Sequence, residues 1–261
     1  MFSNEPHCEY RNAPVEEVIC QLRFPEILTI GANLPVEFQE AIRAEFPRYS
    51  ARKEAPAPKI SGTPGNMKLE NQPLTINYQF TDADGLWKVN LTSKFISISS
   101  HDYHNWEYFA YKMDKPLAAF IQIYKPAYFE RIGLRYLNFI SREDLELEHI
   151  PYRELIDSKY LGILASDGVD EASASRSTVD AEFAIRGGCR AKIHAGPGHI
   201  TRNGQRDSEV HFVFDQDLFM PGKIPVNHVT GALQILHAQA FSIFRGAITE
   251  TLHNAMEPMT E

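Results

Sequence analysis

The chain has 261 residues, of which 43% are hydrophobic and 23% charged, and its formal net charge at pH 7 is −8. This composition lies near the globular average, which excludes a wholly disordered chain, a collagen-like repeat and a disulfide scaffold. The acidic balance argues against a basic nucleic-acid-binding domain, because such domains neutralise phosphates with clustered Lys and Arg. Segment 141–182 holds eleven acidic and four basic residues, so it carries −7 of the net charge.

The first ten residues lack the basic and apolar regions of a secretory signal, and no run of about eighteen apolar residues indicates a membrane span. Cys8, Cys20 and Cys189 are widely spaced, and no C-x-x-C pair suggests zinc binding or redox exchange. We therefore expect a cytoplasmic protein with reduced thiols, no metal, no cofactor and no membrane partner.

The first hundred residues predict strands, one helix and one long loop. Apolar and polar residues alternate over 17–24, which predicts a strand with one buried face. Leu34–Phe46 repeats apolar residues every fourth position after Pro35, which predicts an amphipathic helix. Residues 50–73 hold four prolines without periodicity and predict a long loop, with Pro58 to Ile60 as a candidate short strand. Segments 74–81, 87–93 and 95–100 predict an antiparallel meander.

The rest of the chain continues this mixture. Asn105 precedes a predicted helix that reaches Tyr124, with Pro116 as a candidate kink, and 129–140 returns to strand character. Segment 141–182 predicts a connector or solvated loop with one short helix near 152–156. Three further strands are expected at 177–186, 191–195 and 209–215, with a polar loop at 196–207 and the Gly187-Gly188 hairpin turn. One long amphipathic helix is expected over 226–256.

These elements predict an α+β fold: a twisted, mostly antiparallel sheet of about seven to nine strands, with long helices packed on one face. We expect a helix-grip-like arrangement that leaves a groove between the last helix and the strands. A single domain over 1–261 is the first interpretation. The alternative is a two-lobed chain, with lobes at 1–140 and 183–261 joined by the acidic connector 141–182.

The central strand offers the most prominent candidate site. Arg131 and Arg135 project from the same face, with Gly133 between them leaving room for a ligand or a crossing chain. Paired arginines bind a carboxylate or phosphate through bidentate hydrogen bonds. The alternative interpretation is a solvated sheet face opposite a core formed by Ile132, Leu134 and Tyr136.

Other candidate positions have simpler explanations. His101, Asp102 and His104 are acceptable ligands for zinc or manganese, but the spacing identifies no further ligand and a turn explains Asp102 equally well. The three histidines of the last predicted helix are too far apart to share one ion, so we expect them on a surface or interface: His228, His237 and His253. Nucleophile-elbow, Walker, H-E-x-x-H and dinucleotide-binding motifs are all absent from the sequence.

Two segments taken together resemble a known family. Asn12–Val18, which runs into Leu22–Pro25, and the strand Phe129–Asn138 are similar to the opening and central strand of a sporadically distributed bacterial family of uncharacterised proteins of about this length. Phe244–Met256 is similar to that family's C-terminal end. The resemblance implies a cytoplasmic protein with the patchy distribution of mobile or defence-linked genes, and it supplies no catalytic residues. It directs attention to the polar residues of both motifs: Asn12, Glu17, Arg23, Arg131, Arg135 and Asn138.

We therefore predict a non-enzymatic binding or interaction protein, accessory to a bacterial defence or mobile-element system, with a protein partner or a second copy of itself as the expected partner. The alternative is an enzyme or ligand-binding protein that acts on a nucleotide or another small anionic ligand. Its expected ligand-binding residues are Arg131, Arg135, Asn138, Glu17 and Arg23. Nucleic acid is the least favoured partner, and the one mode considered for it is the stacking of single-stranded bases on aromatic residues of the sheet.

Overall fold

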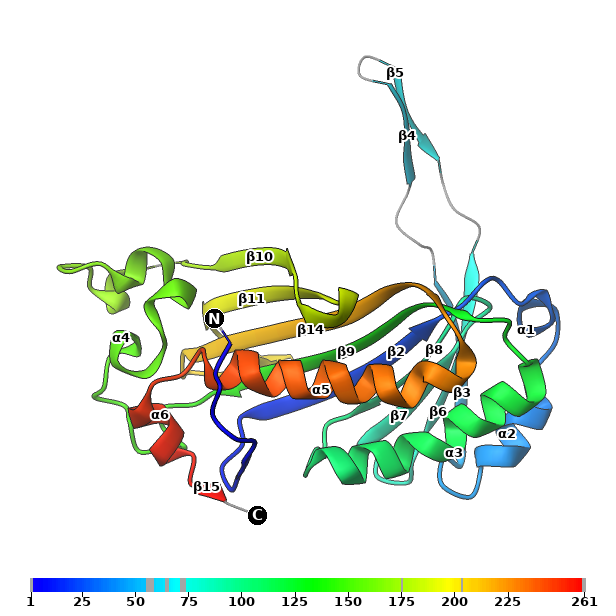
Figure 1. Cartoon of the computed structure of the whole chain (residues 1–261), viewed down its shortest axis with the longest axis horizontal. Coiled ribbons are helices and arrows are strands. Elements are labelled where there is room, and N and C mark those ends of the chain that lie inside the picture. The colour runs from blue at the N-terminus through cyan, green and yellow to red at the C-terminus, as the bar shows by residue number, and fades with distance from the viewer. Residues whose placement is uncertain are drawn as a thin grey trace.

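The computed structural model describes residues 2–54, 59–63, 66–70, 74–174, 176–202 and 204–259. Nine strands of the main sheet lie in these ranges: Val15–Arg23 (β2), Arg48–Glu54 (β3), Thr75–Thr81 (β6), Trp87–Leu91 (β7), Phe95–Ser100 (β8), Phe129–Ile140 (β9), Val179–Ala184 (β10), Arg190–Gly198 (β11) and His211–Ile224 (β14). Their spatial order is β10-β11-β14-β9-β2-β8-β7-β6-β3, and every neighbouring pair is antiparallel (Figure 1).

Three short strand pairs and six α-helices complete the described elements. The pairs are β1 (Glu9–Tyr10) with β15 (Pro258–Met259), β4 (Lys59–Thr63) with β5 (Asn66–Glu70), and β12 (Thr201–Arg202) with β13 (Gln205–Arg206). The α-helices are α1 (Leu28–Ala32), α2 (Val36–Ile42), α3 (Trp106–Tyr124), α4 (Tyr152–Leu155), α5 (Val229–Arg245) and α6 (Glu250–Ala255). The 3-10 helices are Ser158–Tyr160, Gly162–Ala165, Glu171–Ser173, Arg186–Gly188 and Val226–His228. The predicted α+β class and antiparallel sheet are confirmed.

The two halves of the chain connect their sheet strands and long helix in the same order. In each half the first strand pairs with the last strand of that half, so β2 lies beside β8 and β9 lies beside β14. A long helix then follows, α3 after β8 and α5 after β14. The two halves join where β2 pairs with β9. The sheet is therefore continuous across the junction of the two halves.

The two long helices cover the same face of the sheet (Figure 1). On β9 this helix-covered face presents the buried residues Ile132, Leu134, Tyr136 and Asn138. Helix α3 packs through Phe109, Met113 and Phe120, and α5 packs over β9 and β14. Alternation along each strand places the intervening residues on the opposite face, where the side chains are largely polar or charged.

The predicted meander and the α3 helix agree with the structure. Asn105 is the N-cap of α3, where its side chain accepts a hydrogen bond from the Tyr108 amide, and the helix continues through Pro116. The loop predicted for 50–73 is wrong at its start, where β3 pairs with β6 as the edge strand of the sheet, and in its middle, where β4 pairs with β5. All seven residues of β3 are exposed, so no hydrophobic alternation marks this strand. Of the candidate strand at 58–60, Pro58 lies outside the described residues and the rest belongs to β4.

The acidic connector is more structured than a solvated loop. Helix α4 confirms the short helix predicted near 152–156. This helix and the turns that follow it bury several apolar side chains: Tyr152, Leu155, Ile156, Tyr160, Leu161 and Leu164. Tyr152 packs on Phe212, and Tyr160 packs edge-on against Phe214. The prediction of a mostly solvated segment is therefore wrong for this part, because its apolar residues close one end of the core.

The single helix predicted over 226–256 is also wrong. Helix α5 ends at Arg245, and α6 starts after Thr249, whose side chain accepts a hydrogen bond from the Leu252 amide. The break is held by distant backbone: the Asp157 amide donates to the Ala247 carbonyl, and the Thr249 amide donates to the Leu155 carbonyl. These contacts replace helical hydrogen bonds. The spacing of apolar residues could not predict them, because their partners are distant in the chain.

Candidate functional site

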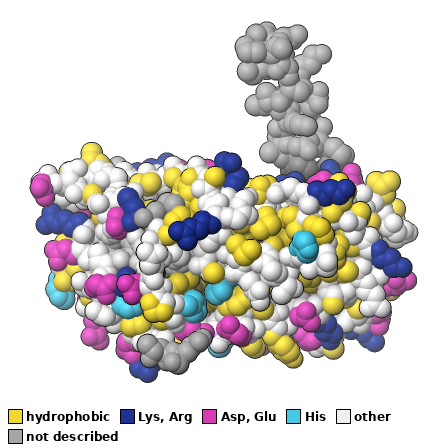
Figure 2. All heavy atoms as spheres, in the orientation of Figure 1, with side chains coloured by type: hydrophobic (Ala, Val, Ile, Leu, Met, Phe, Trp, Pro, Cys, Tyr) yellow, Lys and Arg dark blue, Asp and Glu magenta, His cyan; other side chains and the backbone are white. Residues whose placement is uncertain are grey.

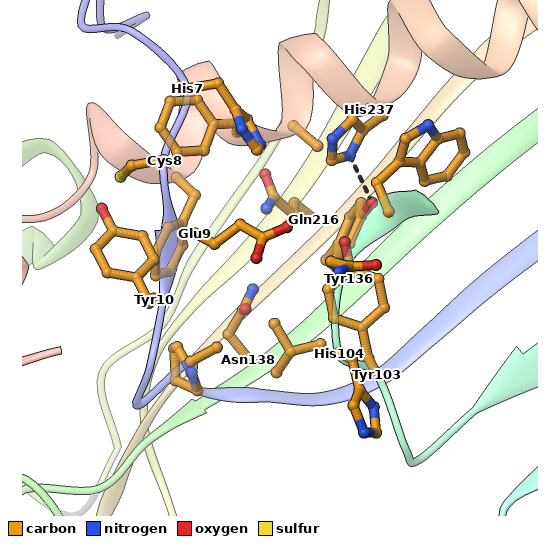
Figure 3. Close-up of a pocket in the computed structure, with 18 residues that line it drawn as sticks. His7, Cys8, Glu9, Tyr10, Tyr103, His104, Tyr136, Asn138, Gln216 and His237 are labelled. Carbon is orange, nitrogen blue, oxygen red and sulfur yellow. Dashed lines mark hydrogen bonds between the residues drawn. The ribbon is translucent and has the colours of Figure 1, made fainter. Parts of the chain in front are cut away.

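A pocket opens on the helix-covered face, between the start of α3, the middle of α5 and the N-terminal segment (Figure 3). The cavity is small, with a volume of about 90 Å³. Its floor is formed by Tyr136 and Asn138 of β9 and by Gln216 of β14. Aromatic rings from all sides make up much of the wall: His7, Tyr10, Tyr103, His104, Trp106, His237, Phe241 and Phe244.

Gln216 provides an unsatisfied polar group in this floor. The residue is only 3% exposed, and its Oε1 atom has no hydrogen-bond partner among the described residues. Figure 3 shows its amide directed into the pocket. A buried acceptor without a partner is costly, because the hydrogen bond that water would supply is lost. The carbonyl oxygen of Gln216 is therefore ready to accept a hydrogen bond from a bound molecule.

His237 and Tyr136 form a fixed neutral pair beside it. The Tyr136 hydroxyl lies 2.9 Å from Nδ1 of His237, and the imidazole stacks on Trp106 with ring centroids 4.6 Å apart and planes 8° from parallel. Burial lowers the pKa of His237 to about 4, with a smaller contribution from His7. Burial also raises the pKa of Tyr136, followed by the effect of the Tyr103 hydroxyl. At neutral pH both groups are uncharged.

The N-terminal segment forms the roof of the pocket and is attached at several points. The Ser3 amide donates to the Ser242 carbonyl of α5 at 2.9 Å, and the Ser242 hydroxyl donates to the Ser3 carbonyl at 2.6 Å. Strand β1 pairs with β15, and the Tyr10 hydroxyl lies 2.8 Å from Nδ1 of His253 on α6. Figure 2 shows histidine side chains gathered where this segment crosses α5 and α6. The C-terminal elements α6 and β15 therefore hold in place the N-terminal segment that covers the pocket.

Within the described part of the chain, the lining of the pocket contains a carboxylate but neither lysine nor arginine. Glu9 supplies this carboxylate and is the one acidic residue among the described lining residues. Figure 3 shows the Glu9 carboxylate pointing into the pocket toward Gln216 and Tyr136. A half-buried carboxylate beside neutral aromatic groups makes the cavity electronegative.

Comparisons with known proteins add no further assignment. No family model, curated protein or solved structure matches this chain. None of the described helices has the length and apolar character needed to cross a membrane.

Four of the five residues predicted to bind a ligand lie together on the opposite face of the sheet. Arg131 binds both carboxylate oxygens of Asp217 at 2.7 and 2.8 Å, and Arg135 binds Asp215 through Nε at 2.7 Å. The hydrogen bonds with Asp215 raise the pKa of Arg135. Arg23 and Glu17 of β2 belong to the same face: the exposed Arg23 pairs with Arg131 in the register, and Glu17 pairs with Leu137 and lies 3.7 Å from Nε2 of His101. Both arginines are thus engaged by carboxylates of β14.

Gly133 has a specific role between the two arginines. A Cβ atom at this position would lie 2.4 Å from Nη1 of Arg131. The guanidinium of Arg131 also lies 4.5 Å from the centroid of the Phe219 ring, which pairs with Gly133 across the sheet. The space above Gly133 therefore holds the Arg131 side chain.

Asn138 lies on the helix-covered face, apart from the arginines. Its Nδ2 donates to the Phe214 carbonyl at 2.9 Å, and the residue lines the pocket. An even spacing separates residues on one strand face, and 138 differs from 131 and 135 by odd numbers. The same rule could have found Gln216, because Phe214 and Leu218 on either side of it are buried.

His237 was expected on a surface or an interface, and it lines the pocket instead. Its position three residues before Ala240 and four after Leu233 places it at the border of the apolar stripe of the helix. A histidine at the border of an apolar helix stripe is therefore the sequence signal that could have identified His237 as a pocket residue. His101 and His104 take part in local contacts, with Nδ1 of His101 3.1 Å from the Glu16 carbonyl and Nδ1 of His104 3.1 Å from the Asp102 carbonyl.

Proposed function

We propose that this chain is a non-enzymatic binding protein whose ligand is a small organic molecule held in the pocket between α3, α5 and the N-terminal segment. The observation that carries the proposal is the unpartnered, buried Oε1 atom of Gln216, which faces a cavity lined by aromatic side chains. A ligand that donates a hydrogen bond to this atom would supply the missing interaction.

Binding is favoured over catalysis by the state of the polar groups. A general base works best when its pKa lies near the working pH, and burial lowers the pKa of His237 to about 4. Burial moves the pKa of Tyr136 in the opposite direction, so this hydroxyl is a poor proton donor to a reaction. The pair is therefore suited to orient a ligand and poorly suited to exchange protons with it.

A blocked-pocket variant tests the proposal. Ala13 is exposed and lines the pocket, so Ala13→Trp narrows the entrance without disturbing the core. Ala127 is an exposed alanine outside the pocket, and Ala127→Trp is the matched control. We expect a thermal-shift screen of small molecules on the full chain to give ligands that stabilise the protein by about 2.7 kcal/mol at 100 times Kd.

Stabilisation should disappear in Ala13→Trp and persist in Ala127→Trp. A screen without ligands, or ligands that bind both variants equally, contradicts the proposed function. Ligand-observed NMR with the two variants gives an independent measurement of the same difference.

We also propose that each half of the chain is a helix-grip-like unit, in which a long helix lies across its own set of strands. The repeated order of strands and helix supports this, since α3 follows the meander of the first half and α5 that of the second. The accessory role in a bacterial defence or mobile-element system, which the family resemblance implies, stays a prediction. Identifying the molecules that co-elute with the protein from its native host tests that role.

The alternative ligand site at Arg131 and Arg135 stays a prediction for a small anion. Carboxylates of β14 already occupy both guanidiniums, so an anion would have to displace Asp217 or Asp215. Loss of nucleotide or phosphate binding in Arg131→Ala and Arg135→Ala would support this alternative.

A further inference from the structure

We infer that the ligand of the pocket is an organic cation, an amine attached to a flat or aromatic body. This inference rests on the proposed function and adds the chemical class of the ligand. It follows from three features of the cavity: a carboxylate without a partner, an unpaired amide oxygen and a wall of aromatic rings.

The first feature is the charge of Glu9. Its side chain is half-buried in the roof of the pocket, and no ion pair or hydrogen bond of this carboxylate occurs among the described residues. Its charge is close enough to Tyr103 to contribute to the raised pKa of that hydroxyl, after burial and the charge of Glu107, whereas the hydrogen bond with Tyr136 lowers that pKa. An ammonium group placed beside Glu9 would neutralise this charge in a partly desolvated site, where such attraction is stronger than in water.

The second feature is the hydrogen-bonding pattern. An ammonium group has only donors, and the pocket offers acceptors in Glu9 and in Oε1 of Gln216. Figure 3 shows these two side chains directed toward the same space. An amine can therefore satisfy both groups at once, whereas a carboxylate or phosphate would place acceptors against acceptors.

The third feature is the aromatic wall. Tyr103, Tyr136 and Phe241 line the space beside Glu9, and the faces of aromatic rings attract cations. No lysine or arginine occurs among the lining residues of the described chain, so neither of these cations covers the ring faces. The same rings provide apolar surface for a flat ligand body.

Probes that share one aromatic body and differ in their terminal group test this class of ligand. We would titrate the full chain by calorimetry with phenyl, indolyl and naphthyl compounds, each as an ethylamine, an acetate and an uncharged ethyl derivative. We expect at least one amine to bind at least tenfold more tightly than its uncharged counterpart, and the acetates to bind more weakly than either.

Two variants assign the effect to the carboxylate. Glu9→Gln keeps the shape of the side chain and should weaken amine binding about tenfold or more, while the affinity of the uncharged derivative stays unchanged. Glu5→Gln alters an exposed carboxylate of the same segment outside the pocket and should leave both affinities unchanged.

The possible results separate the two proposals. The inference is overturned if acetates or uncharged compounds bind as tightly as amines. It is also overturned if the affinity of the amines is the same in Glu9→Gln as in the wild type. In either case the proposed function stands if Ala13→Trp still abolishes binding of these compounds. Failure of every amine likewise overturns the inference. Only the absence of any ligand sensitive to Ala13→Trp contradicts the proposed function itself.

Discussion

Strand β9 carries polar side chains on both of its faces, and the two faces differ in how those side chains are satisfied. On the opposite face, Arg131 and Arg135 are bound by Asp217 and Asp215 of the neighbouring strand. On the helix-covered face, the floor that β9 shares with β14 contains Gln216, whose buried oxygen has no partner in the described residues. The more conspicuous charges are thus engaged within the fold, and the less conspicuous amide is the group available to a ligand.

This difference has a physical origin in the sheet. Cross-strand neighbours of opposite charge interact directly and neutralise one another, as β9 and β14 do on the opposite face. The helix-covered face excludes water, so a polar group there depends on the few atoms packed around it. Unsatisfied groups on a covered face are therefore better indicators of a binding site than charged groups on the opposite one.

The largest expected difference between the faces concerns packing. Leu134 and Leu137 are three residues apart on β9, and Leu134 is fully buried on the helix-covered face whereas Leu137 is partly exposed on the opposite face. We expect Leu134→Ala to lower the free energy of unfolding by about 2–5 kcal/mol. Leu137→Ala should lower it by about 1 kcal/mol or less. Urea denaturation measures both, and equal losses would show that the two faces are equally packed.

The second prediction concerns the pH dependence of stability on the helix-covered face. The pKa of His237 is about 4 in the folded protein, below its ordinary value of 6.5, so the unfolded chain binds more protons between these pH values. The resulting penalty is absent above pH 6.5 and grows to at most about 3 kcal/mol as the pH falls to 4. His237→Gln should therefore be less sensitive to acid than the wild type.

The exposed His228 at the start of the same helix provides the control for this measurement. His228→Gln should keep the wild-type dependence of unfolding free energy on pH. If His237→Gln also follows the wild-type curve, His237 is not held neutral by burial and the account of the pocket must change.

The smallest expected effect on stability concerns Gly133 on the opposite face. Gly133→Ala places a Cβ atom against Nη1 of Arg131 and should disturb its pair with Asp217, at a cost of up to about 1 kcal/mol. In an Arg131→Ala background the same change should instead stabilise the strand by about 0.5–1 kcal/mol, because glycine is unfavourable within strands. A double-mutant cycle measures this reversal of sign. The same cost in both backgrounds would mean that Gly133 serves something other than the arginine.

Local patterns were sufficient where an element carries its own signal. The alternation in β2 and β9 and the Asn105 cap of α3 predict these elements correctly, because one buried face or one cap is specified by adjacent residues. Strand β3 and the break between α5 and α6 were missed, because the first is exposed throughout and the second is held by backbone contacts with residues 155 and 157. Both depend on partners distant in the chain.

The sequence by itself determined the α+β class, the strand parity that places Arg131 and Arg135 on one face, and the acidic segment, since each follows from residue type and short-range spacing. Only the tertiary structure decided which charges have partners and which polar groups do not. Glu9, Gln216 and His237 come from the first strand, the last strand of the sheet and the last long helix, and their meeting depends on how β1, β14 and α5 pack. A binding site of this kind is a property of packing, because no local pattern encodes the distance between such remote residues.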